Sequence, residues 1–283
     1  MTRIAITGGR GRLAALAASH FQREGMEVSL FSREAGGRFK SLSDLPGALA
    51  SHDVLLHCAW STVPLTAEQN PSWTTEQDLP LLKTLLEAAS SFSTHVVFVS
   101  TAAIYGNTGT ERACEESPPQ PLGNYAKGKL EAEAMIRSSG VSSTVLRVTN
   151  LLGERPDPAR PQGVLPRLVQ SARTQSPLTI WGDGSAMKDY LHINDFMAAL
   201  DRVVEVRPQG TFNVGSGESV TVLELARLVE AATGVSVPMS FGDQMPWDVS
   251  YSRINSDRIL ESLGWKARLR IEAAVQECVA HLP

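Results

Sequence analysis

The sequence predicts an α/β fold, in which a doubly wound parallel sheet is joined to a smaller carboxyl-terminal region. Two observations predict it. Short apolar runs rich in β-branched residues alternate with helical patterns through the first half of the chain, as in a parallel sheet that helices cover on both faces. The first of these runs leads directly into a glycine-rich turn and an apolar helix, which is the order found in nucleotide-binding α/β units.

The glycine-rich turn lies in the amino-terminal segment MTRIAITGGRGRLA. Residues 3–7 alternate as a strand, three glycines follow within residues 8–11, and an apolar helix begins near Leu13. Such glycines let the backbone approach a pyrophosphate, and a helix N-terminus offers free N–H groups and a partial positive charge. We therefore expect a Rossmann-type cofactor site, although a glycine turn without a ligand would show the same segment. Its expected contacts are Gly8, Gly9, Arg10, Gly11, Arg12 and Leu13.

The other elements of the sheet follow in chain order. Strands are predicted at residues 27–32, 53–59, 95–100 and 143–148, and helices at residues 79–89 and 125–138. Near Leu151 the pattern changes, because three prolines between residues 154 and 162 indicate a loop into a second region. We assign residues 1–150 to a dinucleotide-binding domain, to which about 192–217 return, and residues 151–283 mainly to substrate binding.

The second region has its own helices and strands. A helix near residues 196–206 is expected to be capped by Asn194 or Asp195, since their short polar side chains favour the N-cap position. Further helices are predicted at residues 164–173, 222–233 and 258–263, and strands at residues 178–181 and 212–214.

The composition is that of an ordinary globular protein and argues against some partners. The chain has 283 residues, of which 42% are hydrophobic and 20% charged, with a net charge of -4. This balance gives no electrostatic reason to bind nucleic acid or an anionic membrane, and no apolar run approaches the ~20 residues of a spanning helix. No signal peptide is visible. The three scattered cysteines suggest the reducing cytoplasm, with neither a disulfide nor a metal site.

A tyrosine and a lysine four residues apart are the candidate catalytic groups. Tyr125 and Lys129 open a predicted helix and therefore share one face of it. A lysine ammonium can lower the pKa of a phenol, so that the tyrosine exchanges a proton with a carbonyl or hydroxyl group. The same spacing is also common on protein surfaces. Thr101 adds weight, because it follows a predicted strand at the carboxyl end, where open α/β sheets bind ligands.

Together these motifs resemble the extended short-chain dehydrogenase/reductase superfamily, in its sugar-nucleotide epimerase/dehydratase/reductase group. The glycine turn is similar to that group's opening motif, except that Ala14 replaces the third glycine. The resemblance covers nearly the whole chain, in the family's order and spacing. It continues in STAAIYG (100–106), LRVTN (146–150), PLTIWGDG (177–184), KDYLHIND (188–195), TFNVGSG (211–217) and LGW (263–265).

The resemblance implies a role for each candidate. Tyr125 would be the general acid/base, Lys129 would lower its pKa and bind the nicotinamide ribose, and Thr101 would hydrogen-bond the reacting oxygen of the substrate. Cys58 and Ala59 would lie beside the cofactor, and His57 would be a core position close to it. Asp195 is expected to be a structural cap and His192 a packed histidine.

The end of the second strand bears on the choice of cofactor. Family members that use NAD usually carry an acidic residue there, for the ribose 2′-hydroxyl, whereas this chain has Ser32. Arg33 follows, and Arg10 lies in the glycine turn; Arg12 and Arg38 are weaker candidates. A guanidinium can bind a phosphate through two hydrogen bonds. We therefore expect NADP, with NAD as the alternative, unless both arginines are ordinary surface charges.

The residues after Thr101 restrict the reaction. Ala102 and Ala103 stand where family members that dehydrate a hexose, or epimerise beside a ketone, carry acid/base side chains. Net reduction of a keto sugar and C4 epimerisation through a transient ketone remain. The arginines favour NADP-dependent reduction of a keto group on a nucleotide-linked deoxysugar. A C4 epimerase with tightly bound NAD is the alternative, and a non-catalytic NADP-binding protein is a third reading.

The substrate and the assembly state are the least specified. We expect a nucleotide sugar to bind mainly after Leu151, and a homodimer to form through the helices at 79–89 and 125–138, as relatives often do. Candidate substrate contacts are Thr101, Asn150, Arg155, Lys188 and Arg253, with Arg160 and Arg167 as further basic residues.

Overall fold

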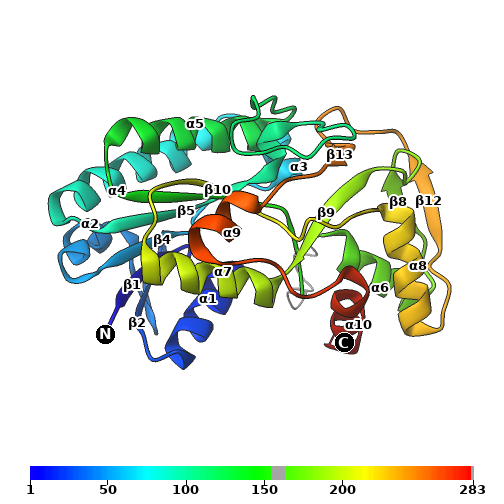
Figure 1. Cartoon of the computed structure of the whole chain (residues 1–283), viewed down its shortest axis with the longest axis horizontal. Helices are drawn as coiled ribbons and strands as arrows, with labels where there is room; N and C mark the ends of the chain where they lie inside the picture. Colours follow the sequence, from blue (N-terminus) through cyan, green and yellow to red (C-terminus); the bar gives the residue numbers. More distant parts are fainter. Residues whose placement is uncertain (154–162, 282–283) are drawn as a thin grey trace. The chain divides into compact units, whose positions relative to one another are not determined.

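The computed structural model describes residues 1–153 and 163–281 (Figure 1). The chain folds into two compact units. Unit 1 consists of Met1–Ile104, Gly123–Arg147 and Leu200–Phe212. Unit 2 consists of Tyr105–Leu122, Val148–Ala199 and Asn213–Pro283. Within the described ranges, no helix is both long and apolar enough to cross a membrane.

A seven-stranded sheet runs through unit 1 in the order β10-β6-β5-β4-β1-β2-β3. β1 pairs in parallel with both β2 and β4, so the strand order reverses beside β1, as in a doubly wound sheet. The predicted α/β fold is confirmed. The strands are β1 (Arg3–Thr7), β2 (Glu27–Ser32), β3 (Phe39–Ser41), β4 (Val54–His57), β5 (His95–Thr101), β6 (Ser143–Val148) and β10 (Gly210–Val214).

Helices pack against this sheet and complete the core of unit 1. Phe31, Leu55 and Phe98 from the strands join Leu82 and Leu85 of α4 in one buried cluster. The helices are α1 (Arg12–Arg23), α2 (Leu45–Ala48), α3 (Pro64–Gln69), α4 (Leu79–Phe92), α5 (Asn124–Ser139) and α7 (Ile193–Val206), with the 3₁₀ turns η1 (Leu42–Asp44), η2 (Leu49–Ser51) and η4 (Ala102–Tyr105) and the π-helical turn η3 (Thr74–Asp78).

A buried ion pair fixes α5 against the sheet. The Glu133 carboxylate on α5 accepts hydrogen bonds from two strands of the sheet. Nη2 of Arg147 on β6 donates to it at 2.7 Å, and the hydroxyl of Ser100 on β5 donates to it at 2.5 Å. Both charged side chains are almost fully buried. Removing either partner would leave an uncompensated charge in the interior. This contact therefore holds in place the helix that begins with the candidate catalytic residues.

Unit 2 is built on short strands around β9 (Met187–His192) and on a separate parallel pair, β8 and β12. Only β8 among these strands is predicted from the sequence. β7, β11 and β13 have only two or three residues, too few to show a clear period. The remaining elements are β7 (Asn150–Leu152), β8 (Leu178–Trp181), β11 (Ser219–Thr221), β12 (Met239–Gly242), β13 (Tyr251–Ser252), α6 (Val164–Thr174), α8 (Val222–Thr233), α9 (Asp257–Leu263) and α10 (Ile271–His281).

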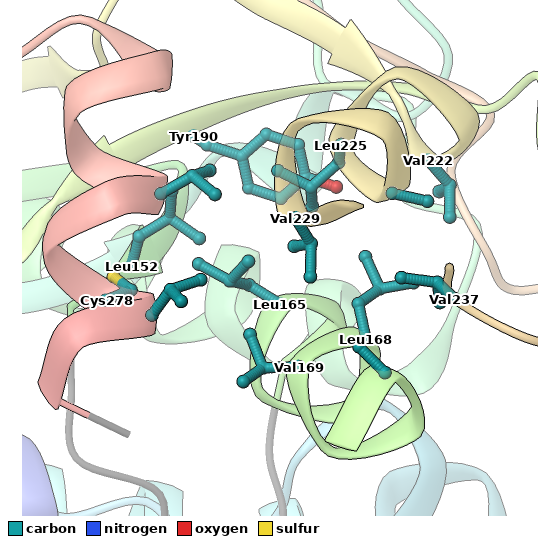
Figure 2. Close-up of a cluster of buried hydrophobic side chains, with 14 of the residues drawn as sticks. Leu152, Leu165, Leu168, Val169, Tyr190, Val222, Leu225, Val229, Val237 and Cys278 are labelled. Atoms are coloured by element: carbon teal, nitrogen blue, oxygen red, sulfur yellow. The ribbon is translucent and has the colours of Figure 1, made fainter. Parts of the chain in front are cut away.

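The core of unit 2 lies between its helices (Figure 2). Leu165 and Leu168 of α6 face Leu225 and Val229 of α8, and Cys278 of α10 joins the same cluster. This apolar packing, rather than a long sheet, holds unit 2 together.

The expected cap of the helix at 196–206 differs in the structure. α7 already begins at Ile193, so Asn194 and Asp195 lie inside its first turn. Oδ2 of Asp195 accepts the backbone N–H groups of Arg268 and Leu269 at 3.1 and 2.9 Å. Asp195 therefore ties a distant loop to α7, because tertiary partners outcompete the local cap.

Candidate active site

The glycine turn connects β1 to α1 in a conformation that requires glycine. Gly8 has φ +71°, and a Cβ atom added there would lie 3.0 Å from the backbone N of Ala59. The N–H of Gly9 donates to the carbonyl of Phe31 at 2.9 Å. Gly11 is the N-cap of α1, and no side chain caps the helix there. The turn thus brings backbone close to the ends of β2 and β4, beside an uncapped helix N-terminus.

Thr7 joins the ends of β1 and β4. Its hydroxyl oxygen accepts the N–H groups of Cys58 and Ala59, both at 3.1 Å, and lies 2.9 Å from Nδ1 of His57. Burial, assisted by the charge of Lys129, lowers the pKa of His57 to about 3. Burial raises the pKa of the Cys58 thiol to about 12. Both side chains therefore stay neutral, and neither is a ready acid/base group near neutral pH.

The two arginines predicted to bind a 2′-phosphate have different surroundings near the end of β2. Arg10 donates to the carbonyl of Glu34 at 3.2 and 3.3 Å, and its guanidinium lies 4.8 Å from the Phe39 ring centroid. The hydroxyl of the buried Ser32 donates to the same carbonyl. Arg33 is exposed. The structure thus anchors Arg10 to the loop after β2 and leaves the side chain of Arg33 at the surface of unit 1.

The structure brings Tyr125, Lys129 and the end of β5 together. Lys129 is only 4% exposed, and its Nζ donates to the carbonyl of Val99 at 2.9 Å. The same ammonium lies 3.9 Å from the ring centroid of Trp60 and 5.9 Å from that of Tyr125, within the range of cation–π attraction. Thr101 ends β5, and its oxygen accepts the N–H of Ala103 at 3.2 Å. Its hydroxyl proton can therefore still be donated to a ligand.

The surroundings of Tyr125 and Lys129 shift their pKa values, and the shift of Tyr125 is opposite to the one predicted from the sequence. Burial lowers the pKa of Lys129 to about 7, although Asp78, Cys58 and Glu133 act to raise it. Burial, with Asp78 as the second cause, raises the pKa of Tyr125 to about 12. The expected lowering of the phenol pKa by Lys129 is thus outweighed within the protein. A further positive charge near the phenol would be needed to favour its ionised form.

Asp78 and Trp60 are not predicted as site residues from the sequence. In the structure, Asp78 acts electrostatically on Lys129, and the ring of Trp60 contacts the Lys129 ammonium. Asp78 directly precedes α4 and would be taken from sequence for an ordinary N-cap. Its side chain makes no capping hydrogen bond to α4. It instead accepts the N–H and the hydroxyl of Ser61 at 2.8 and 2.7 Å. No pattern in the sequence distinguishes these two uses of an aspartate.

The candidate substrate residues of unit 2 are engaged by neighbours. Nζ of Lys188 lies 2.5 Å from Oδ1 of Asp248. Nη1 of Arg253 donates to the carbonyl of Thr110 at 2.8 Å, and Nδ2 of Asn150 donates to a backbone carbonyl at 3.0 Å. Arg167 is exposed on α6, whereas Arg155 and Arg160 lie outside the described residues.

Comparison with known proteins identifies close similarity to one family. The NAD dependent epimerase/dehydratase family matches residues 4–215. UDP-glucose 4-epimerase of Azospirillum brasilense is 32% identical over 243 residues, covering 75% of this chain and 68% of that protein. UDP-glucose 4-epimerase 3 of Oryza sativa subsp. japonica is 27% identical over 265 residues, covering 83% and 71%.

Solved structures agree in fold. The Thermus thermophilus UDP-glucose 4-epimerase complex with NAD has a TM-score of 0.89 at 25% identity and covers 99% of this chain and 98% of that one. MoeE5 in complex with UDP-glucose and NAD has a TM-score of 0.87 at 23% identity and covers 98% and 97%, a likeness of fold alone. The fold of the whole chain is thus that of extended short-chain dehydrogenase/reductase proteins.

These similarities overturn the predicted reaction. The relatives named above are 4-epimerases, and both solved structures contain NAD. The prediction of NADP-dependent net reduction is therefore wrong, and its alternative, C4 epimerisation, fits better. The physical reason is that both reactions use the same tyrosine, lysine and hydroxyl group. Those residues do not distinguish net transfer of a hydride to the sugar from removal and return of the same hydride. The arginines near β2 bear only on the ribose of the cofactor.

Proposed function

The chain belongs to the NAD-dependent epimerase/dehydratase family and is an enzyme of that family, and we propose that it inverts C4 of a UDP-linked sugar with NAD as its bound cofactor. The observation that carries this proposal is the Tyr125–Lys129 pair beside Thr101, in a chain similar to UDP-glucose 4-epimerases. Ala102 and Ala103 offer no second acid/base group, so the proposed reaction is one that a single tyrosine can serve.

The residues of the glycine turn fit the proposed cofactor. Gly8 lets the turn lie against the backbone of Cys58 and Ala59, and α1 begins at this turn with N–H groups that no side chain caps. NAD bound there would take a hydride from C4 and return it to the opposite face, and its cationic ring would lower the pKa of a nearby phenol. NAD is proposed over NADP because the matched structures contain NAD.

The side chains have distinct proposed parts in the proton transfer. Tyr125 removes the proton of the sugar 4-hydroxyl as C4 becomes a ketone, and gives it back when C4 is reduced again. Thr101 donates a hydrogen bond to the same oxygen, since its own oxygen already accepts the N–H of Ala103. Lys129 holds positive charge near the phenol and binds the nicotinamide ribose. These steps leave the cofactor unchanged over one turnover, so none is consumed.

The proposed assembly and compartment follow from the sequence. We propose a homodimer that uses α4 and α5, whose outer faces include the exposed Phe92 on α4. The three cysteines form no disulfide, which suits the reducing cytoplasm. UDP-sugar binding is assigned mainly to unit 2.

The test of this function uses the purified chain without added cofactor. UDP-glucose and UDP-galactose should interconvert, and nucleotide released from the denatured protein should be NAD. The Tyr125→Phe variant is the control, because it keeps the glycine turn and loses the acid/base group. Consumption of added NADPH in proportion to substrate, or no interconversion of any UDP-sugar pair, would exclude the proposal.

A further inference from the structure

The buried carboxylate of Asp78 acts electrostatically on both Tyr125 and Lys129 and has no part in the proton transfer proposed above. Asp78 is 2% exposed. Its two oxygens accept the N–H and the hydroxyl of Ser61 at 2.8 and 2.7 Å. Burying a carboxylate is costly unless hydrogen bonds and an opposite charge compensate it. Two neutral donors satisfy its hydrogen bonding but do not supply the opposite charge.

The backbone around Asp78 is held directly against the helix that carries Lys129. Asp78 ends the π-helical turn η3, a type of turn that is frequent at functional sites. A Cβ atom added at Gly128 would lie only 2.6 Å from Cγ2 of Thr74, the first residue of η3. Glycine at this position therefore permits the close approach of η3 to α5, one residue before Lys129.

A loop connects the acid and the lysine from the other side. Ser61, which binds the Asp78 carboxylate, directly follows Trp60. The ring of Trp60 lies 3.9 Å from Nζ of Lys129, and Phe98 forms a second aromatic wall at 4.7 Å. The ammonium group is thus surrounded by aromatic faces, whose attraction replaces only part of the lost hydration.

Several titratable groups affect the pKa of Lys129. Asp78, Cys58 and Glu133 raise the pKa of Lys129 against the effect of burial. Burial raises the pKa of Asp78, whereas the hydrogen bonds from Ser61 and then the charges of Lys129 and Arg33 act to lower it. Asp78 is also the charged group that acts on Tyr125, where it raises the pKa of the phenol. His57, the remaining titratable neighbour, stays neutral because its pKa falls to about 3.

We propose that Asp78 is a positioning residue that keeps Lys129 in its ammonium form, as the buried counter-charge that aromatic walls alone do not supply. Ser61 holds the carboxylate in place, and Gly128 allows the start of η3 to approach α5. The inference rests on the proposed function in one respect, namely that Lys129 must be charged to assist Tyr125. The charge relation between Asp78 and Lys129 can be measured whether or not the chain is an epimerase.

The direct test is the protonation of Lys129 in the full chain. The Asp78→Asn variant removes the charge and keeps the shape of the side chain and one acceptor oxygen for the N–H of Ser61. Its amide NH2 can donate to the hydroxyl oxygen of Ser61 in place of the second bond. The titration midpoint of Lys129, followed by the NMR signal of its ε-carbon and assigned with Lys129→Met, should fall by about 1 pH unit. Asp53→Asn is the matched control, since Asp53 accepts the N–H of Arg3 at 2.7 Å at the other end of β4. An unchanged midpoint in Asp78→Asn would overturn the inference.

A second variant and a second measurement test the role of Asp78 independently. Ser61→Ala removes one of the hydrogen bonds that favour the charged form of Asp78. The carboxylate is then protonated more readily, so the titration midpoint of Lys129 should fall by a smaller amount than in Asp78→Asn. The pH profile of C4 epimerisation should move to lower pH at both limbs in Asp78→Asn, because the loss of negative charge lowers the pKa of Tyr125 and of Lys129. A rate that drops equally at every pH would show a merely structural role and contradict the inference.

The two proposals can fail separately. A shifted Lys129 titration in a chain that interconverts no UDP-sugar pair would refute the proposed function and support the role of Asp78. Epimerisation with an unshifted Lys129 titration would support the function and refute the role of Asp78.

Discussion

Units 1 and 2 both contain candidate site residues, but they hold them differently. In unit 1 the candidates follow the carboxyl ends of parallel strands or begin the next helix, from the glycine turn after β1 to Thr101 at the end of β5. In unit 2 the candidates were basic or amide side chains chosen for their charge or hydrogen-bonding capacity. Lys188 pairs with Asp248, and Arg253 donates to the carbonyl of Thr110. Position at the end of a parallel strand thus brings candidate residues together, which charge alone does not.

The reason is geometric. Parallel strands end at one edge of the sheet, so residues far apart in the sequence are forced together there. A lone cation has no such constraint, and a nearby carboxylate or carbonyl can satisfy it at little cost. The predictions below test this difference, from the largest expected effect to the smallest.

The largest effect is expected in unit 1 at Tyr125. Tyr125→Phe removes the proton-transfer group and should lower kcat for C4 epimerisation at least about 100-fold. NAD binding should persist, because the glycine turn is untouched. Stopped-time assays with UDP-glucose and titration with NAD measure the two effects. Turnover close to that of the unmodified chain would remove Tyr125 from the mechanism.

Acid should destabilise unit 1 through two buried histidines. Burial lowers the pKa of His57 to about 3 and that of His95 to about 4, whereas an unfolded histidine titrates near 6.5. Between those values the unfolded chain binds more protons than the folded one. The free energy of unfolding is therefore fully retained above about pH 6.5 and falls below it, by about 1.4 kcal/mol per pH unit for each histidine.

Urea unfolding at pH 7 and pH 5 measures this acid effect. His95→Gln should reduce the difference between the two pH values by removing one titrating group, while its amide can still bond Ser142 or Thr144, which lie 2.8 Å from the imidazole nitrogens. Stability that is equal at the two pH values in the unmodified chain would mean that these histidines do not stay neutral in the fold.

Arg33 should matter for NADP and hardly at all for NAD. Its side chain is exposed at the end of β2, where a 2′-phosphate would add a charge-assisted contact of about 1–3 kcal/mol. Calorimetric titration should show tighter binding of NAD than of NADP, and Arg33→Ala should weaken only NADP. Tighter binding of NADP by the unmodified chain would restore the cofactor predicted from the sequence.

The smallest effect is expected at Lys188 in unit 2. Its ion pair with Asp248 is partly exposed, so Lys188→Met should lower the free energy of unfolding by less than about 1 kcal/mol. KM for UDP-glucose should change little, because the ammonium already has a partner; Asp248→Asn is the matched control. A large rise in KM for Lys188→Met alone would make Lys188 a substrate contact and remove the contrast between the two units.

Most of unit 1 could be predicted from sequence, and less of unit 2. β1, β2 and β6 have the predicted bounds, because strands buried on both faces appear as apolar runs. β13 has two residues and β7 and β11 have three, so no periodicity could reveal them. Asp78 could not be recognised, since an aspartate before a helix normally predicts a cap.

The sequence by itself determined the fold and the candidate residues Tyr125 and Lys129, because hydrophobic period, glycine turns and a four-residue helical spacing are local properties of the chain. Only the tertiary structure decided the surroundings of those residues. It buried Lys129 against Trp60, placed Asp78 next to the pair and raised the pKa of Tyr125 to about 12. Protonation depends on desolvation and on charges brought together through space, and residues distant in sequence supply both.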